Sequence, residues 1–295
     1  MSILSPCCPF SSVATVLLRM LVVIVGVAGI RHSAHARDWW ALDSPSPGGA
    51  HSIGSPTAGC LRGGVALPLE GPGYQVVRAS RGRYFGHPRL IRYIRALGQK
   101  IATSRLSSVY VGDLSQPRGG PMAYGHASHQ NGLDVDIWLT PGRPLLRPAA
   151  LREEVTVPPV VIENGTALIP HLWTSGHANL LHLAAGMPEV DRIFVHPVIK
   201  RELCRSSSNR AWLRKIRPWR GHSAHFHVRL TCGDTEDEAC LSSRPLPPGD
   251  GCDALDYYFS GPGRSHLPLP KELPPGHRPP QVALPTACLA VLKGY

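Results

Sequence analysis

Two short segments hold most of the side chains in this chain that could do chemistry. Residues 125–136 read GHASHQNGLDVD, and residues 221–227 read GHSAHFH. Together they contain five histidines and two aspartates. Imidazole and carboxylate groups are the usual ligands of catalytic zinc, and imidazole is the most frequent general acid or base. The two segments are therefore candidates for the halves of a metal-dependent active site.

In the first segment, a turn is needed before His129 and Asp136 can share one ion. Seven extended residues span about 23 Å, whereas zinc ligands lie about 2 Å from the metal. The dipeptide Asn131-Gly132 is a strong tight-turn signal and would fold His129 back toward the strand that carries Asp136. A hairpin with a solvated aspartate and a surface histidine is the alternative interpretation of this segment.

In the second segment, alternate residues of an expected strand place His225 and His227 on one face, with His222 just upstream. Three imidazoles together are unfavourable when protonated unless a metal or an acidic group faces them. Neutral, hydrogen-bonded surface histidines are the alternative. Two imidazoles and one carboxylate leave a position open on tetrahedral zinc, which is the catalytic pattern. Spacing alone does not decide which of His225 and His227 is the ligand.

The elements that must position these segments can be predicted from hydrophobic spacing. Apolar residues at helical intervals predict a helix over 85–102, with Pro88 in its first turn. Between residues 133 and 139, Asp134, Asp136 and Trp138 alternate with apolar residues, as in a strand. Further strands are expected at 108–112, 193–195 and 225–230, and further helices at 178–185 and 209–216. This pattern predicts an α+β fold with an antiparallel sheet core, flanking helices and long irregular, disulfide-stapled termini.

The amino terminus indicates export. Arg19 precedes an apolar run over 20–30, and Ala34-His35-Ala36 supplies the small residues of a cleavage site, so residues 1–36 are expected to be a signal peptide. Eleven residues at about 1.5 Å each are too short to cross a hydrocarbon core of roughly 30 Å. The remaining single domain, 37–295, is expected to comprise an irregular arm at 37–83, a catalytic core at 84–241 and a Pro-rich extension at 242–295.

Cysteine content and charge agree with export. Six cysteines remain after signal removal, and an even number in an exported chain predicts three disulfides, with fifteen pairings available. The formal net charge is +11, and the loss of Arg19 and Arg31 with the signal leaves +9. Such a balance favours an anionic polymer as partner. Export makes that polymer the cell wall rather than nucleic acid.

Four longer segments carry a family resemblance that covers nearly all of residues 60–255. They are GGVALPLEGPGYQVVR from Gly63, GHASHQNGLDVDIW from Gly125, RIFVHPVIKRELC from Arg192 and WLRKIRPWRGHSAHFHVRL from Trp212. With them the chain resembles the penicillin-insensitive murein endopeptidases. That family belongs to a wider class with lysostaphin-type peptidases, D-Ala-D-Ala metallopeptidases and the amino-terminal hedgehog domain.

The resemblance implies a role for each histidine. It makes His129, Asp136 and His227 the zinc ligands and places His225 at the position of the catalytic base. His222 matches an assisting histidine, which would donate a hydrogen bond to the oxyanion of the tetrahedral intermediate.

The resemblance also bears on the number of metal ions and on the disulfides. His126 matches a position of an accessory second metal site. Residues 163–166 lack the Asp and His that should complete that site, so one functional zinc per chain is predicted. The implied disulfides are Cys60–Cys288, Cys204–Cys252 and Cys232–Cys240.

The expected function is that of a zinc-dependent murein endopeptidase of the periplasm, which hydrolyses D-alanyl–meso-diaminopimelyl cross-links of peptidoglycan. The alternatives are a D-Ala-D-Ala carboxypeptidase of the same class and a non-catalytic, zinc-containing cell-wall-binding protein. Peptidoglycan is the expected partner, with no nucleic acid and no stable membrane insertion after signal removal. The sequence leaves a homodimer open.

Overall fold

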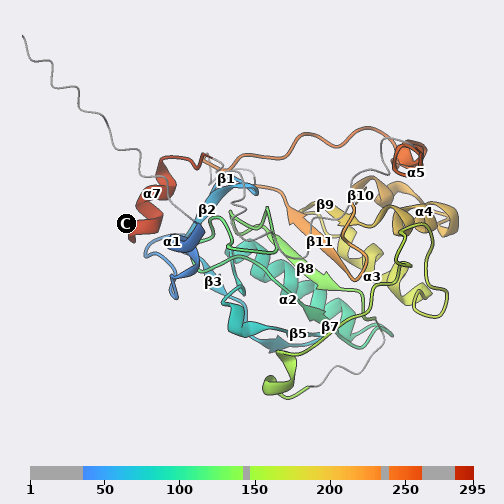
Figure 1. The fold of residues 1–295 in the computed structure, drawn as a ribbon, viewed down its shortest axis with the longest axis horizontal. Coiled ribbons are helices and arrows are strands. Elements are labelled where there is room, and N and C mark those ends of the chain that lie inside the picture. Colours follow the sequence, from blue (N-terminus) through green and yellow to red (C-terminus); the bar gives the residue numbers. More distant parts are fainter. Residues whose placement is uncertain (1–35, 142–146, 234–238, 261–282) are drawn as a thin grey trace, which may run out of the picture. The chain divides into compact units, whose positions relative to one another are not determined.

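The computed structural model describes residues 36–141, 147–233, 239–260 and 283–295 (Figure 1). All but the last residue of the expected signal peptide therefore lies outside the described residues. Among the residues described, no helix combines the length and the apolar character that crossing a membrane requires.

A seven-stranded sheet forms the centre of the fold, with the strand order β10-β9-β11-β8-β7-β5-β4 (Figure 1). Most neighbouring strands pair antiparallel, whereas β10 with β9 and β5 with β7 pair parallel. The predicted α+β class with an antiparallel-rich sheet is confirmed. The strands are β4 (Glu70–Gly71), β5 (Tyr74–Val76), β7 (Val109–Val111), β8 (Asp134–Trp138), β9 (Val190–Val195), β10 (Ile216–Pro218) and β11 (His225–Leu230).

Strand β8 has the alternation that its sequence predicts. Val135 and Ile137 are fully buried in the main hydrophobic core, and strand geometry turns Asp134 and Asp136 to the opposite face. β8 lies between β7 and β11, so it has no free edge. The face that carries the two aspartates is thus held at the middle of the sheet.

Helix α2 (Pro88–Ala102) confirms the predicted helix over 85–102. Leu90, Ile94, Leu97 and Ile101 are buried at helical spacing in the main core. At its start, Nδ1 of His87 accepts a hydrogen bond from the backbone N–H of Arg89, and Pro88 occupies the first turn. Proline suits this position because the first helical N–H groups have no partner within the helix.

Helix α4 (Pro197–Ser206) begins in the same way, although no helix was predicted there. Nδ1 of His196 accepts from the N–H of Val198, and Pro197 follows the cap. Helix α3 (Ser175–Ala185) confirms the prediction at 178–185. The helix expected at 209–216 is instead a short 3₁₀ turn, η3 (Ala211–Lys215), because Ile216 already pairs with Ile193 in the sheet.

The expectation of an irregular arm at 37–83 is wrong. This region forms an antiparallel hairpin of β1 (His51–Ser55) and β2 (Ala58–Arg62), and it also supplies β4 and β5. Further short elements are α1 (Ala36–Trp40), β3 (Val65–Ala66), which pairs with β6 (Phe85–Gly86), and the turn η1 (Ala79–Arg81). Strands of two to five residues give too few alternations for a pattern to emerge among the glycines and prolines.

The three disulfides are the predicted ones. Cys60–Cys288 joins β2 to α7 (Ala287–Lys293), Cys204–Cys252 joins α4 to the carboxyl-terminal segment, and Cys232–Cys240 closes a short loop after β11. The extension that follows residue 242 is thereby pinned, as expected. Its described part contains the turn η4 (Asp253–Leu255), helix α5 (Asp256–Phe259) and helix α7. One further 3₁₀ turn, η2 (Ala149–Arg152), lies between β8 and α3.

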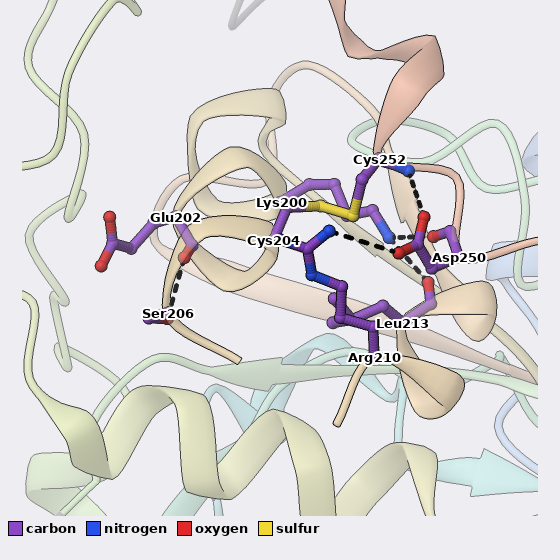
Figure 2. Close-up of a disulfide and its surroundings, with 8 residues drawn as sticks. All are labelled: Lys200, Glu202, Cys204, Ser206, Arg210, Leu213, Asp250 and Cys252. Carbon is purple, nitrogen blue, oxygen red and sulfur yellow. Dashed lines mark hydrogen bonds and ion pairs between the residues drawn. A yellow bond between two sulfur atoms is a disulfide. The ribbon is translucent and has the colours of Figure 1, made fainter. Parts of the chain in front are cut away.

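Beside Cys204–Cys252 lies a fully buried lysine (Figure 2). The ammonium of Lys200 donates hydrogen bonds to the carbonyl oxygens of Leu213, at 2.7 Å, and Asp250, at 2.6 Å. The Asp250 carboxylate in turn accepts from the backbone N–H of Cys252 and lies 3.8 Å from Arg210. Burial lowers the pKa of Lys200 to about 8. This one side chain therefore joins α4, η3 and the carboxyl-terminal segment.

The low pKa of Lys200 predicts a pH-dependent contribution to stability. Because the folded state holds this proton less tightly than the unfolded chain, wild-type protein should gain stability relative to Lys200→Met as pH rises from about 8 toward 10.5. At pH 7 the variant should already lose stability, since the carbonyl oxygens of Leu213 and Asp250 lose their donor. Urea unfolding at pH 7 and pH 9.5 measures both effects. Lys100→Met, an exposed lysine of α2, is the control, and an equal pH-dependent difference there would contradict the role of burial.

Candidate active site

Strands β8 and β11 place three of the predicted site residues side by side. In their antiparallel register, Asp136 lies opposite His227 and Trp138 lies opposite His225. Directly opposite residues have Cβ atoms about 4.5–5.5 Å apart on one face of the sheet. The carboxylate and both imidazoles are thus held by two central strands, independently of any loop.

His129 reaches the same place through the predicted turn. Its backbone is in the left-handed region, with φ 68°, and Gly132 is also left-handed, with φ 76°. The Asp134 carboxylate accepts a hydrogen bond from the N–H of His129, which ties the turn to β8. Nε2 of His129 lies 3.5 Å from Oδ1 of Asp136, and the imidazole is fully buried. The alternative of a surface histidine beside a solvated aspartate is wrong.

Asp136 is the centre of the cluster. Its Oδ2 lies 3.6 Å from Nδ1 of His126 and 3.6 Å from Nε2 of His225, while its Oδ1 faces His129 and His227. Burial raises the pKa of Asp136, but His225 and the other imidazoles outweigh it and hold the pKa well below its usual range. Ligand atoms of His126, His129 and Asp136 all lie within 4.8 Å of one another.

His227 sits between two carboxylates. Its Nδ1 is 3.2 Å from Oδ1 of Asp136, and its Nε2 is 3.3 Å from Oδ2 of Asp134. Burial lowers the pKa of His227, but the two carboxylates outweigh burial and raise it to about 9. The ring therefore has one nitrogen toward the centre of the cluster and the other toward an outer carboxylate. This is the arrangement in which metal-binding histidines are commonly oriented.

Several buried polar atoms at the centre have no hydrogen-bond partner among the described residues. They include both ring nitrogens of His129 and Oδ1 of Asp136. Buried polar atoms in folded proteins are almost always paired, because an unpaired group forfeits its hydration without compensation. A cation coordinated here would satisfy one ring nitrogen of His129 and Oδ1 of Asp136. The donor set of imidazoles and a carboxylate therefore fits a divalent metal ion.

His222 completes the cluster from the loop between β10 and β11. Its ring lies 5.0 Å from that of His225, centroid to centroid. Nδ1 of His222 is 3.3 Å from the carbonyl oxygen of Trp219, which can only accept, so Nδ1 carries the hydrogen. Burial, together with His225 and His227, lowers the pKa of His222 to about 3. The neutral ring therefore leaves Nε2 as a proton acceptor.

Two further aspartates belong to the site, and the sequence analysis assigned them no role. Oδ1 of Asp134 accepts from Nε of Arg229 at 2.8 Å, and the two residues are register partners in β8 and β11. Oδ2 of Asp113 lies 3.0 Å from Nε2 of His126 and 3.0 Å from Arg83. Strand alternation already placed Asp134 beside Asp136, so its role was detectable. Asp113 follows β7 in a loop, where no periodicity points to its partner.

Removal of the Asp134 carboxylate should be strongly destabilising. It is fully buried and neutralises Arg229 and His227 while it anchors the His129 turn. Asp134→Ala should lower the free energy of unfolding by roughly 3–5 kcal/mol, because buried cations lose their counter-charge. Urea unfolding in the presence of a chelator measures this loss without a metal contribution. Glu202→Ala, which breaks a surface pair with Arg205, should leave the free energy of unfolding nearly unchanged, because solvent screens an exposed pair. Equal losses in the two variants would contradict the assignment.

Comparison with known proteins finds relatives along most of this chain. The family model described as penicillin-insensitive murein endopeptidase matches residues 52–293. A protein of that name from Haemophilus influenzae is 43% identical over 267 residues, which cover 88% of this chain and 92% of the relative. One from Klebsiella pneumoniae is 42% identical over 280 residues, which cover 92% and 96%. The matched region contains every residue of the histidine cluster, and the chain belongs to the penicillin-insensitive murein endopeptidase family.

Proposed function

We propose that this chain is a zinc-dependent murein endopeptidase that hydrolyses D-alanyl–meso-diaminopimelyl cross-links of peptidoglycan in the periplasm. The observation that carries the proposal is the buried group of His129, Asp136 and His227, in which the ring nitrogens of His129 and Oδ1 of Asp136 have no hydrogen-bond partner among the described residues. Three more imidazoles lie beside this group. The relatives named above are murein endopeptidases, which supports the same substrate class.

His129, Asp136 and His227 are the proposed ligands of one zinc. His227 and Asp136 face each other on paired central strands, so their separation is set by the ladder itself. His126 comes from a loop, its side chain is 20% exposed, and its Nε2 is engaged by Asp113. A second metal ion at His126 would therefore need further ligands. Residues 163–166 contain neither an aspartate nor a histidine that could supply them, which supports a single metal.

Zinc supplies Lewis acidity, which activates water and polarises a carbonyl oxygen near neutral pH. The chain's own residues handle the proton. Nε2 of His225 faces the centre of the cluster, 3.6 Å from Asp136, and burial lowers the pKa of His225, so the ring is neutral and can accept a proton from water. His222 offers Nε2 as an acceptor when it is neutral. It can therefore donate to a developing oxyanion only after it has taken up a proton.

The charge of the chain fits an anionic polymer. The formal net charge of +11, which falls to +9 when Arg19 and Arg31 leave with the expected signal, would favour retention on an insoluble, acidic wall over free diffusion. Peptidoglycan is the proposed partner, and export to the periplasm is what the amino-terminal signal implies.

Digestion of purified, cross-linked muropeptide dimers tests the reaction. The mature protein should convert dimers to monomers, as measured by mass spectrometry. A chelator should abolish the conversion, and added zinc should restore it. Loss of terminal D-alanine from intact dimers would instead indicate a carboxypeptidase. Retention on peptidoglycan without cleavage by zinc-loaded protein would indicate a non-catalytic wall-binding protein.

Single substitutions separate ligand from base. His227→Ala should lose bound zinc and activity together, because it removes a proposed ligand. His225→Ala should keep about one zinc per chain and lose turnover by roughly 10²–10⁴-fold, as expected for a general base. Metal analysis and muropeptide turnover measure the two properties. His182→Ala is the control, since that exposed ring stacks on Trp212. Normal turnover in His225→Ala would show that the base is wrongly assigned.

A further inference from the structure

Two large aromatic side chains beside the histidine cluster are unusually exposed. Trp219 is 60% exposed and Tyr124 is 55% exposed. Tryptophan is highly buried on average, because its large ring loses little and gains much by leaving water. A large aromatic ring that stays exposed to solvent beside a candidate active site therefore indicates that a ligand covers it during function.

The backbone of Trp219 is fixed by hydrogen bonds, whereas its indole ring is exposed to solvent. Its N–H donates to the carbonyl oxygen of Val195 at 2.8 Å, and its own carbonyl accepts from Nδ1 of His222. The indole meets Phe194 edge-on, with centroids 5.8 Å apart, and Phe194 meets His227 edge-on at 5.4 Å. The ring thus stands one side chain away from a proposed zinc ligand, and it is positioned by main-chain bonds that do not depend on the indole.

Tyr124 is linked to the cluster through Arg83. Its ring covers the guanidinium of Arg83 at 4.2 Å, and Arg83 also donates to the carbonyl oxygen of Tyr124. Arg83 binds Asp113, which in turn holds His126. Successive contacts therefore run from one ring to the other through the whole cluster, in the order Tyr124, Arg83, Asp113, His126, Asp136, His225, His222 and Trp219.

We propose that Trp219 binds the stem peptide of the substrate on one side of the scissile bond, with Tyr124 as the opposing wall. This inference rests on the proposed function. A cross-linked stem presents amide planes, alanine methyl groups and the methylene chain of a diamino acid. Such groups pack well on an aromatic face, and an exposed indole needs no rearrangement to receive them. The ring contributes binding that is equal in the ground and transition states, so its loss should raise KM more than it lowers kcat.

The test uses a sugar-free, cross-linked tetrapeptide dimer as substrate. Trp219→Ala should raise KM by roughly tenfold, because the substrate loses its contact with one face of the indole. The kcat should stay within about threefold of wild type. Zinc content should be unchanged, since the main-chain bonds to Val195 and His222 persist. Trp219→Phe should recover most of the affinity. Trp40→Ala is the matched control, because Trp40 is 57% exposed in α1, which lies well apart from β10 (Figure 1).

Equilibrium binding of the same dimer to chelator-treated protein keeps the proposal independent of catalysis. Trp219→Ala should bind roughly tenfold more weakly than wild type there as well. Unchanged binding and KM in Trp219→Ala would overturn the proposal, as would a fall in kcat at constant KM, which would mean that the residue acts through His222. Absence of cleavage by wild type, with weaker binding by Trp219→Ala, would sink the proposed reaction and leave the peptide subsite standing.

Discussion

The pairing of β8 with β11 is the constraint on which the site depends. It sets Asp136 against His227 and Asp134 against Arg229, so the proposed metal ligands, their counter-charge and the proposed base share one face of the sheet. A slip of β11 by one residue would turn His225, His227 and Arg229 to the face of the sheet opposite that of the β8 aspartates. The register is protected because Val135, Ile137 and Val228 are fully buried on the other side. The hydrophobic core thus determines where the polar cluster lies.

This arrangement concentrates charge where a folded protein normally avoids it. Two carboxylates and several imidazoles are buried together, and each Asp side chain is kept ionised by cationic or polar neighbours despite burial. Asp134 is compensated within the protein by Arg229, whereas the inner atoms of Asp136 and His129 are not. The outer part of the cluster therefore stabilises the fold. The inner part keeps polar atoms without a hydrogen-bond partner among the described residues, and a bound ion could coordinate them. Asp134 thus serves stability, whereas Asp136, two residues further on, is the aspartate proposed to bind the metal.

The sequence predicts the parts of the fold that have strong local patterns. Helix α2 has five apolar residues at helical spacing, β8 and β11 alternate cleanly, and the Asn131-Gly132 turn has a distinctive dipeptide. Helix α4 was missed because buried Lys200 interrupts its apolar face. The role of Asp113 was missed because its partners Arg83 and His126 meet it only in the folded chain. The disulfide pairs came from family resemblance, since cysteine number alone leaves fifteen choices.

The bridge between Cys60 and Cys288 spans 228 positions, and all seven strands of the main sheet lie between its ends. The sheet is therefore enclosed in one covalent circle. Proteolytic nicking of a single loop anywhere within that circle would leave the two fragments covalently attached to each other. The circle therefore lets the chain keep its two parts covalently joined after a first cut.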